Sequence, residues 1–77
     1  MKNKVLLFGM LADAVGLPFI EIGAVSDTET LRRRISREYP KLDRFPYTIA
    51  VNRKVVASGQ TINAGDELAL LPPFAGG

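Results

Sequence analysis

GDELALLPPFAGG, residues 65–77, decides the fold of this 77-residue chain because it joins a turn, a strand and a tail. Its first two residues are a turn signal, and every residue from Leu68 to Leu71 is apolar. A strand that is apolar on both faces is typical of the centre of a sheet, where both faces are buried. Two prolines then end the strand and keep the following residues extended. The stretch therefore predicts a central strand over residues 67–71 that leads directly into a tail.

The opening stretch KVLLFG has the same character. The residues of its expected strand, 5–8, alternate between two apolar faces, which are Leu6 and Phe8 on one and Val5 and Leu7 on the other. The two apolar strands are expected to be neighbours at the centre of the sheet. One helix can cover only one face of so small a sheet. Apolar surface on the other face is then either exposed as a partner site or covered by a short helix and loops, and the pattern leaves both open.

The segment after the first strand predicts a short helix and a second strand. MLADAVG, residues 10–16, consists of good helix formers and ends on a glycine. Pro18 then requires an extended or turn geometry. In FIEIGAV, residues 19–25, side chains alternate with the period of two of a half-buried strand. The first two strands are therefore expected to pair.

The main helix is expected to begin after Ser26 or Asp27. Either side chain can cap a helix, and Ser26 with Glu29 fits the S-x-x-E capping box. Pro40 ends the helix. An apolar stripe at a spacing of four residues is expected to face the core, and it consists of Leu31, Ile35 and Tyr39.

A hairpin is predicted after a loop by YTIAVNRKVVA, residues 47–57, with its turn at Asn52-Arg53. The turn lacks the Asn-Gly pair that the commonest two-residue turn favours, so its type stays open. SGQTINAGDE is then expected to be a turn-rich connection to the last strand.

The order strand, strand, helix, strand, strand, strand predicts an α+β fold with a mixed sheet. It resembles the β-grasp, or ubiquitin-like, architecture. We expect four to five strands, one main helix packed on one face, and a short helix after the first strand. The β-grasp domain is expected over residues 1–71, and an extended C-terminal tail that ends in Gly-Gly over residues 72–77.

Composition excludes several kinds of site. The chain has no cysteine and no histidine, which removes disulfides, a thiolate nucleophile and the commonest metal ligands. No metal site is therefore expected. A membrane-length apolar run and a signal peptide are not evident in the sequence, so the chain is expected to be cytoplasmic, with no membrane partner.

The charge pattern does not favour nucleic-acid binding. The net charge is only +2. Two arginines of the RRR run lie four residues from a glutamate, in the pairs Glu29–Arg33 and Arg34–Glu38. We therefore expect a solvated helix face and no nucleic-acid partner.

The tail has the chemistry of a substrate rather than of a catalyst. Pro72 and Pro73 extend it, and its residues at roughly 3.3 Å each would reach about 20 Å. Gly76 and Gly77 carry no side chain, so the end is slim enough to enter a narrow channel of another protein. A carboxylate is a poor electrophile, and acyl transfer from it requires prior activation, typically by adenylation.

A glycine pair at the end of a β-grasp domain resembles the ubiquitin-like proteins and the bacterial sulfur carriers. Within that superfamily, GDELALLPPFAGG resembles the end of the small, sulfur-carrier subunits of molybdopterin synthase. KVLLFGMLADAVG is similar to the opening strand and first helix of that family, and IAVNRKVV to its central hairpin. The likeness covers nearly the whole chain.

The resemblance implies a sulfur carrier of molybdenum cofactor biosynthesis. An activating enzyme related to ubiquitin-activating proteins would adenylate the Gly77 carboxylate with ATP, and a sulfur donor protein would supply the sulfur of the thiocarboxylate. The tail would enter the large subunit of molybdopterin synthase, in an expected heterotetramer, and give sulfur to precursor Z (cyclic pyranopterin monophosphate). The large subunit would carry the catalytic side chains, and this chain would bind no cofactor.

The resemblance also assigns roles by position. Gly77 would bear the thiocarboxylate, and Gly76 would give clearance in the channel. Phe74 and Ala75 would line that channel after the two prolines, although the family often has a smaller aliphatic residue in place of Phe74. The residues that would present apolar surface to partners are Phe8, Val55 and Leu71.

Three other functions stay open. A thiamine-type sulfur carrier shares the fold and the glycine pair but normally lacks the two prolines before the tail. A ubiquitin-like protein modifier would use the same activated carboxylate to form isopeptide bonds with lysine. A plain interaction module would carry the two glycines incidentally.

Overall fold

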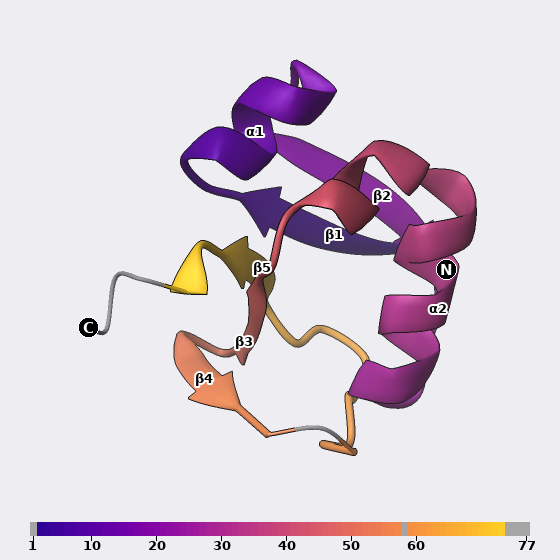
Figure 1. Cartoon of the computed structure of the whole chain (residues 1–77). Coiled ribbons are helices and arrows are strands. Elements are labelled where there is room, and N and C mark those ends of the chain that lie inside the picture. Colours follow the sequence, from indigo (N-terminus) through magenta and orange to yellow (C-terminus); the bar gives the residue numbers. More distant parts are fainter. Residues whose placement is uncertain (1, 58, 74–77) are drawn as a thin grey trace.

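In residues 2–57 and 59–73, which the computed structural model describes, five strands and three helical segments follow one another (Figure 1). The strands are β1 (Lys2–Leu7), β2 (Phe19–Gly23), β3 (Thr48–Val51), β4 (Lys54–Val56) and β5 (Leu68–Leu71). The helical segments are the α-helices α1 (Met10–Val15) and α2 (Thr28–Glu38) and the 3-10 helix η1 (Pro40–Arg44). None of the helices in these described ranges is long and apolar enough to cross a membrane.

The strands form one mixed sheet in the order β2-β1-β5-β3-β4. β1 and β5 pair in parallel, and the other neighbouring strands pair antiparallel. The position of β5 at the centre confirms the prediction from its apolar residues, and its pairing with β1 confirms that the two apolar strands are neighbours. A mixed sheet with the main helix on one face is the predicted α+β, β-grasp architecture.

The face of the sheet that carries α2 forms the hydrophobic core. Residues of four strands cross this face in register and are less than a tenth exposed, namely Ile20, Val5, Leu68 and Val51 in one row and Leu7, Leu70 and Ile49 in the next. Leu31 and Ile35 of α2, Leu11 of α1 and Leu42 of η1 belong to the same buried cluster. All three helical segments therefore cover one face, and each buried aliphatic side chain stabilises the fold by about 1.5–3 kcal/mol.

Asp27 rather than Ser26 caps α2. Its side chain accepts a hydrogen bond from the Thr30 backbone N–H over 2.7 Å. This bond is the main reason that the pKa of Asp27 lies below its ordinary value. The capping box expected from Ser26 and Glu29 is therefore wrong, because the helix begins at Thr28 and its cap is one residue later than that box requires.

The segment after α2 forms η1, where the sequence analysis predicts only a loop. Pro40 does follow the end of α2 at Glu38, as predicted. The same proline suits the first turn of η1, where its missing N–H leaves no hydrogen bond unmade. Leu42 of η1 is fully buried. Tertiary packing thus stabilises a short turn that leaves no periodic pattern in the sequence.

The β3–β4 hairpin turns at Asn52 and Arg53, as predicted. Both residues have a positive φ, of 52° and 71°, and two positive φ values in a two-residue turn identify type I′. Glycine is preferred at the second position because an L-residue in the left-handed region costs about 1–2 kcal/mol. The turn is therefore formed by tertiary context and not by the strongest local signal for it.

Candidate functional site

On the face of the sheet opposite α2, one register row is apolar from one edge to the other, while the neighbouring row pairs Lys4 with Glu21. One residue of each strand lies in a single register row across it, in the order Phe19, Leu6, Ala69, Ala50 and Val55. These residues alternate along their strands with the residues of the core. We call these five residues, together with Phe8 and Leu71, the open face.

Large side chains of the open face are accessible to solvent. Val55 on the edge strand β4 is 61% exposed and Phe8 is 44% exposed, while Leu6 and Leu71 are half-buried. The short helix does not cover this surface, because the buried leucines of α1 and η1 belong to the core on the other face. Ala69 and Ala50 in the middle of the row are nevertheless buried, at 8% and 3% exposed. Exposed apolar patches of this kind commonly mark partner sites.

The three residues to which the resemblance assigns partner binding lie at two places on the open face. Leu71 ends β5 and Phe8 follows β1, and these two lie at the same end of the sheet because β1 and β5 are parallel. Val55 lies two strands away from β5, on β4. The prediction that the first strand extends to Phe8 is wrong. The strand ends at Leu7, because Gly9 turns the chain with a φ of 57°. Their role in binding stays a prediction.

The base of the tail lies against the turn between β1 and α1. A Cβ atom added to Gly9 would lie 3.1 Å from Cγ of Pro72. The Thr48 hydroxyl of β3 donates a hydrogen bond to the carbonyl of Leu71 over 3.4 Å. The described chain ends at Pro73. The other residues predicted to enter the channel or to react lie outside the described residues, namely Phe74, Ala75, Gly76 and Gly77.

A hydrogen-bonded network around Asp66 precedes β5. The Asp66 carboxylate accepts bonds from the Asn63 backbone N–H over 2.8 Å and from the Asn52 side-chain amide over 3.1 Å. These bonds, that from Asn63 first, lower the pKa of Asp66 below its ordinary value. The side-chain oxygen of Asn52 in turn accepts from the Glu67 backbone N–H over 3.0 Å. The sequence predicts the hairpin turn at Asn52 and the turn at Gly65-Asp66. It does not predict the hydrogen bonds that join the two turns, because Asn52 and its partners are 14 and 15 residues apart.

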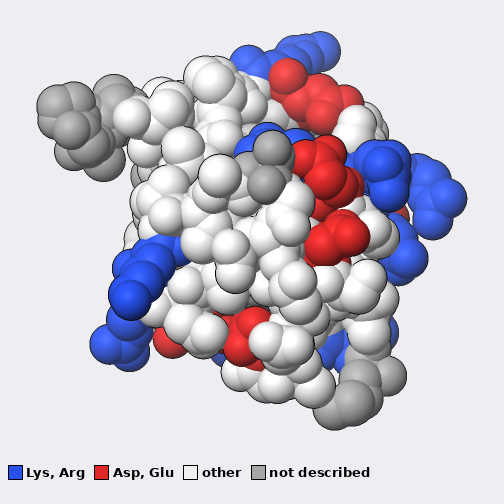
Figure 2. Space-filling model, turned by 90° about the horizontal axis from the view of Figure 1, so that it is seen from below, with Lys and Arg blue, Asp and Glu red and all other residues white. Residues whose placement is uncertain are grey.

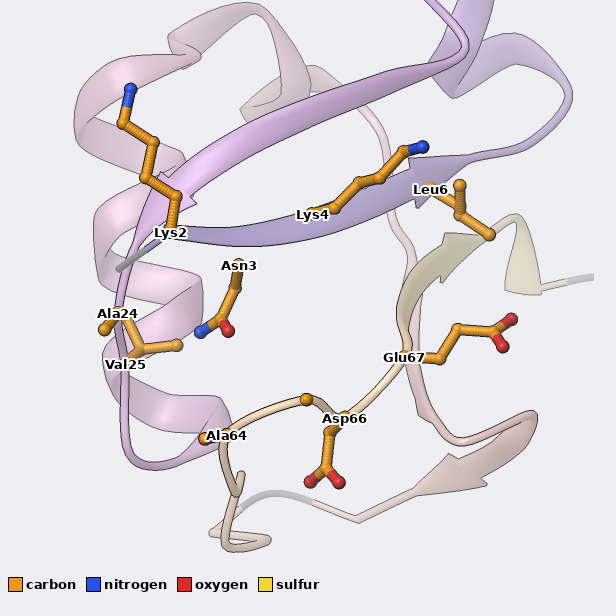
Figure 3. Close-up of a pocket in the computed structure, with 10 residues that line it drawn as sticks. Lys2, Asn3, Lys4, Leu6, Ala24, Val25, Ala64, Asp66 and Glu67 are labelled. Carbon is orange, nitrogen blue, oxygen red and sulfur yellow. The ribbon is translucent and has the colours of Figure 1, made fainter.

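A hollow of about 540 Å³ lies between β1 and the loop at residues 64–67, at the end of the sheet away from the tail. Asn3 points into this space, whereas the charged ends of Lys2, Lys4 and Asp66 extend away from it (Figure 3). Within the described part of the chain, His, Cys, Asp and Glu form no group that could hold a metal ion. The hollow thus lacks the convergent polar groups that are typical of a ligand site.

The arginines of α2 do not form the predicted ion pairs. Within α2, which is described in full, neither Glu29–Arg33 nor Arg34–Glu38 lies within 4.0 Å. The guanidinium of Arg34 lies instead over β2, where a Cβ atom at Gly23 would be 2.8 Å from its Nη1 atom. Lys and Arg side chains lie on the side of the molecule where Figure 1 places α2, with Asp and Glu side chains beside them, and another group of Lys and Arg lies on the opposite side (Figure 2). The helix α2 is therefore stabilised by the packing of its apolar face on the core and not by ion pairs on its charged face.

The sequence is similar to a known family over almost its whole length. The chain matches the ThiS family over residues 5–77. It is 32% identical to the molybdopterin synthase sulfur carrier subunits of Dictyostelium discoideum and of Escherichia coli (strain K12). Both alignments cover 96% of this chain, and they cover 94% and 98% of the two relatives.

Solved structures share the fold. SAMP1 from Haloferax volcanii superposes with a TM-score of 0.79 and 26% sequence identity over the whole of both chains. A chain in the complex of subunits 1 and 2 of the molybdopterin-converting factor from Helicobacter pylori superposes with a TM-score of 0.71 and 28% identity, again over the whole of both chains. These similarities confirm the β-grasp fold. With the family match over residues 5–77, they show that this chain belongs to the ThiS family of ubiquitin-like β-grasp proteins.

Proposed function

We propose that this chain is the sulfur-carrier subunit of a molybdopterin synthase. The observation that carries the proposal is the continuity of β5 with the tail. β5 is the central strand of the sheet, it ends at Leu71, and Pro72 and Pro73 follow directly. Residues 74–77, which include the two glycines, therefore follow within two residues of the central strand of the sheet. The similarity to two proteins named molybdopterin synthase sulfur carrier subunit supports the same function.

The proposed chemistry takes place at the Gly77 carboxylate. A carboxylate oxygen attacks the α-phosphate of ATP on the activating enzyme, which forms the glycyl adenylate and releases pyrophosphate. A persulfide of the donor protein then attacks the glycyl carbonyl and displaces AMP, and a thiol cleaves the resulting acyl disulfide, which leaves the thiocarboxylate and a disulfide. The thiocarboxylate sulfur attacks a carbon of precursor Z (cyclic pyranopterin monophosphate) and displaces an oxygen there. Water then hydrolyses the thioester, which leaves the sulfur on the product and restores the Gly77 carboxylate. This chain contributes the reacting group and binds neither ATP nor another cofactor.

The proposed partner is the large subunit of the synthase, which would supply the catalytic side chains within a heterotetramer. The complex of subunits 1 and 2 of the Helicobacter pylori converting factor supports a partner of this kind. The open face would bind it, because a broad apolar surface beside the base of the tail would hold the tail at the entrance of the partner's channel. The reaction would take place in the cytoplasm.

Intact mass spectrometry of the protein from its native host tests the proposal. We expect a population in which one terminal oxygen is replaced by sulfur. Deletion of Gly77 should abolish both this species and sulfur transfer, while the urea unfolding midpoint stays that of the full chain, because the deletion removes no core residue. Sulfur transfer that survives this deletion would refute the proposal.

The second candidate function is that of a protein modifier. A solved structure that favours it is the small archaeal modifier protein 1 of Haloferax volcanii, with which this chain shares 25% sequence identity. The same adenylate would then react with a lysine amine to form an isopeptide bond. Tryptic peptides from the host proteome distinguish the two functions. Lys54 is the last Lys or Arg of the chain, so trypsin would leave residues 55–77 on each modified lysine. This remnant on lysines of other proteins, without any thiocarboxylate, would assign the chain to the modifiers.

A further inference from the structure

The base of the tail and the β1–α1 turn are brought together by the parallel pairing of two strands. Leu7 of β1 pairs with Leu70 of β5, and parallel strands end at the same edge of a sheet. The chain after β1 therefore turns away beside the chain that leaves β5 (Figure 1). Gly9 lies two residues after Leu7, and Pro72 lies two residues after Leu70.

Gly9 is restricted both by its backbone and by the space around it. Its φ of 57° and ψ of −134° lie in a region that side chains rarely adopt. A Cβ atom there would also be 3.1 Å from Cγ and 3.9 Å from Cδ of Pro72. The first of these distances is shorter than ordinary van der Waals contact, so the proline ring would have to move. The absence of a side chain at Gly9 thus allows the ring to lie where it does.

Gly16 has a positive φ but no close neighbour, so it serves as a control for the contact with Pro72. It also has a positive φ, of 84°, and it caps the other end of α1. A Cβ atom at Gly16 would meet no atom within 4 Å. Alanine at Gly16 therefore strains the backbone alone, and by less than at Gly9, because Gly16 is in the left-handed αL conformation and Gly9 is not. Alanine at Gly9 also displaces Pro72, and the Pro72→Ala background separates this effect from backbone strain.

We propose that Gly9 is a positioning residue for the C-terminal tail, because the Pro72 ring packs against it and this contact sets the direction in which the tail leaves the sheet. The inference rests on the proposed function, in which this tail carries the reacting carboxylate. The ring of Pro72 fixes its φ. The orientation of this ring therefore sets the direction in which the next residue continues. If fully extended, the residues from 73 to 77 would span about 16 Å at roughly 3.3 Å per residue. A shift of Pro72 would change the point and the direction at which these residues leave the sheet.

The test is single-turnover sulfur transfer from a chain that already carries the thiocarboxylate. Such a chain can be prepared by sulfide cleavage of an intein fusion, which bypasses the activating enzyme. We expect Gly9→Ala to transfer sulfur to precursor Z on the large subunit about tenfold more slowly than Gly16→Ala, since displacements of about 1 Å in a reactive geometry can cost about 100-fold in rate. Equal rates for the two variants would overturn the inference.

A double-mutant cycle shows whether the effect passes through the proline. Pro72→Ala removes the Cγ atom that a Cβ at Gly9 would meet. Gly9→Ala/Pro72→Ala should therefore be no slower than Pro72→Ala alone. A tenfold loss that persists in the Pro72→Ala background would show that Gly9 acts through the fold and not through the tail.

A structural readout keeps the inference separate from the proposed function. In the wild-type chain, a nuclear Overhauser effect is expected between the Gly9 α-protons and the Pro72 ring protons. It should survive in Gly16→Ala, and its absence from the wild type would overturn the inference even if Gly9→Ala did not fold. If the wild-type chain transfers no sulfur at all, the proposed function fails, and this measurement still decides the inference.

Discussion

Thr28 is a buried polar residue whose hydroxyl joins α2 to the segment before β5. Its side-chain oxygen accepts hydrogen bonds from the backbone N–H groups of Gly59 and Gln60, over 3.0 and 3.1 Å, and the residue is only 2% exposed. The sequence analysis does not single out Thr28, because its partners are 31 and 32 residues away. A lone threonine at a helix start has no local pattern that would reveal such a role.

Replacement of Thr28 by valine tests this role at nearly constant volume. Thr28→Val leaves the Gly59 and Gln60 N–H groups without this acceptor. Both bonds are part-buried, and we expect the free energy of unfolding to fall by about 1 kcal/mol. Urea unfolding measures the change. Thr28→Ser keeps the oxygen and should lose much less, so an equal loss in both variants would contradict the assignment.

Arg53 lies in the hairpin turn with a φ of 71°. Arg53→Gly should raise the free energy of unfolding by about 0.5–1 kcal/mol, because glycine adopts this conformation without a steric cost. The variant loses the ion pair with Glu67 at 3.5 Å, but exposed pairs contribute only about 0–1 kcal/mol. Thermal unfolding with Arg53→Ala as the control measures both effects. Alanine keeps the strained φ and loses the ion pair, so stabilisation by alanine as well would show that the explanation by backbone strain is wrong.

The elements differ in how far their sequences predict them. α1 with its glycine cap and the end of α2 before Pro40 are predicted, because each has a local pattern. The place of the β3–β4 turn is predicted from the apolar runs on either side of it, but its type is not. η1 is not predicted, since it depends on the burial of Leu42 by other elements. The predicted ion pairs of α2 are also wrong, because the spacing of charges makes a pair possible without deciding the direction of long, solvated side chains.

The start of β5 should be sensitive to acid through Asp66. Its hydrogen bonds lower its pKa from the ordinary value of 3.8. Their contribution to stability is therefore complete above about pH 4 and is lost as the pH falls through the lowered pKa. Asp66→Asn should be less stable than the wild type at pH 6, and the difference should shrink toward pH 2. Urea unfolding midpoints over this range measure it, and a difference that stays constant with pH would contradict the prediction.

At the scale of the whole molecule, the helical segments of the described residues cover one sheet face, and the proposed function assigns the open face to the large subunit. Val55→Asp should weaken binding to the large subunit by about tenfold or more, because a charge in the apolar part of an interface must be desolvated. The free energy of unfolding should hardly change, since Val55 is 61% exposed. Isothermal titration calorimetry measures the affinity.

Leu17→Asp is a matched control for that experiment. Leu17 is 53% exposed, and it lies near Tyr39 and Pro40, away from the open face. The same substitution there should leave binding unchanged. Equal losses of affinity in both variants would mean that general destabilisation or charge, and not the open face, explains the result.

The sequence by itself determined the type and order of the main elements and the central place of β5, and it carries the prediction that Gly77 is the reacting residue. These follow from periods of two and four residues, from prolines and glycines at element ends, and from the absence of cysteine and histidine. Only the tertiary structure decided that all three helical segments cover one face, that Asn52 bonds to the turn before β5, and that Gly9 contacts Pro72. The physical reason is that such contacts join residues far apart in the chain, and strand order and register, which bring them together, leave no local pattern in the sequence.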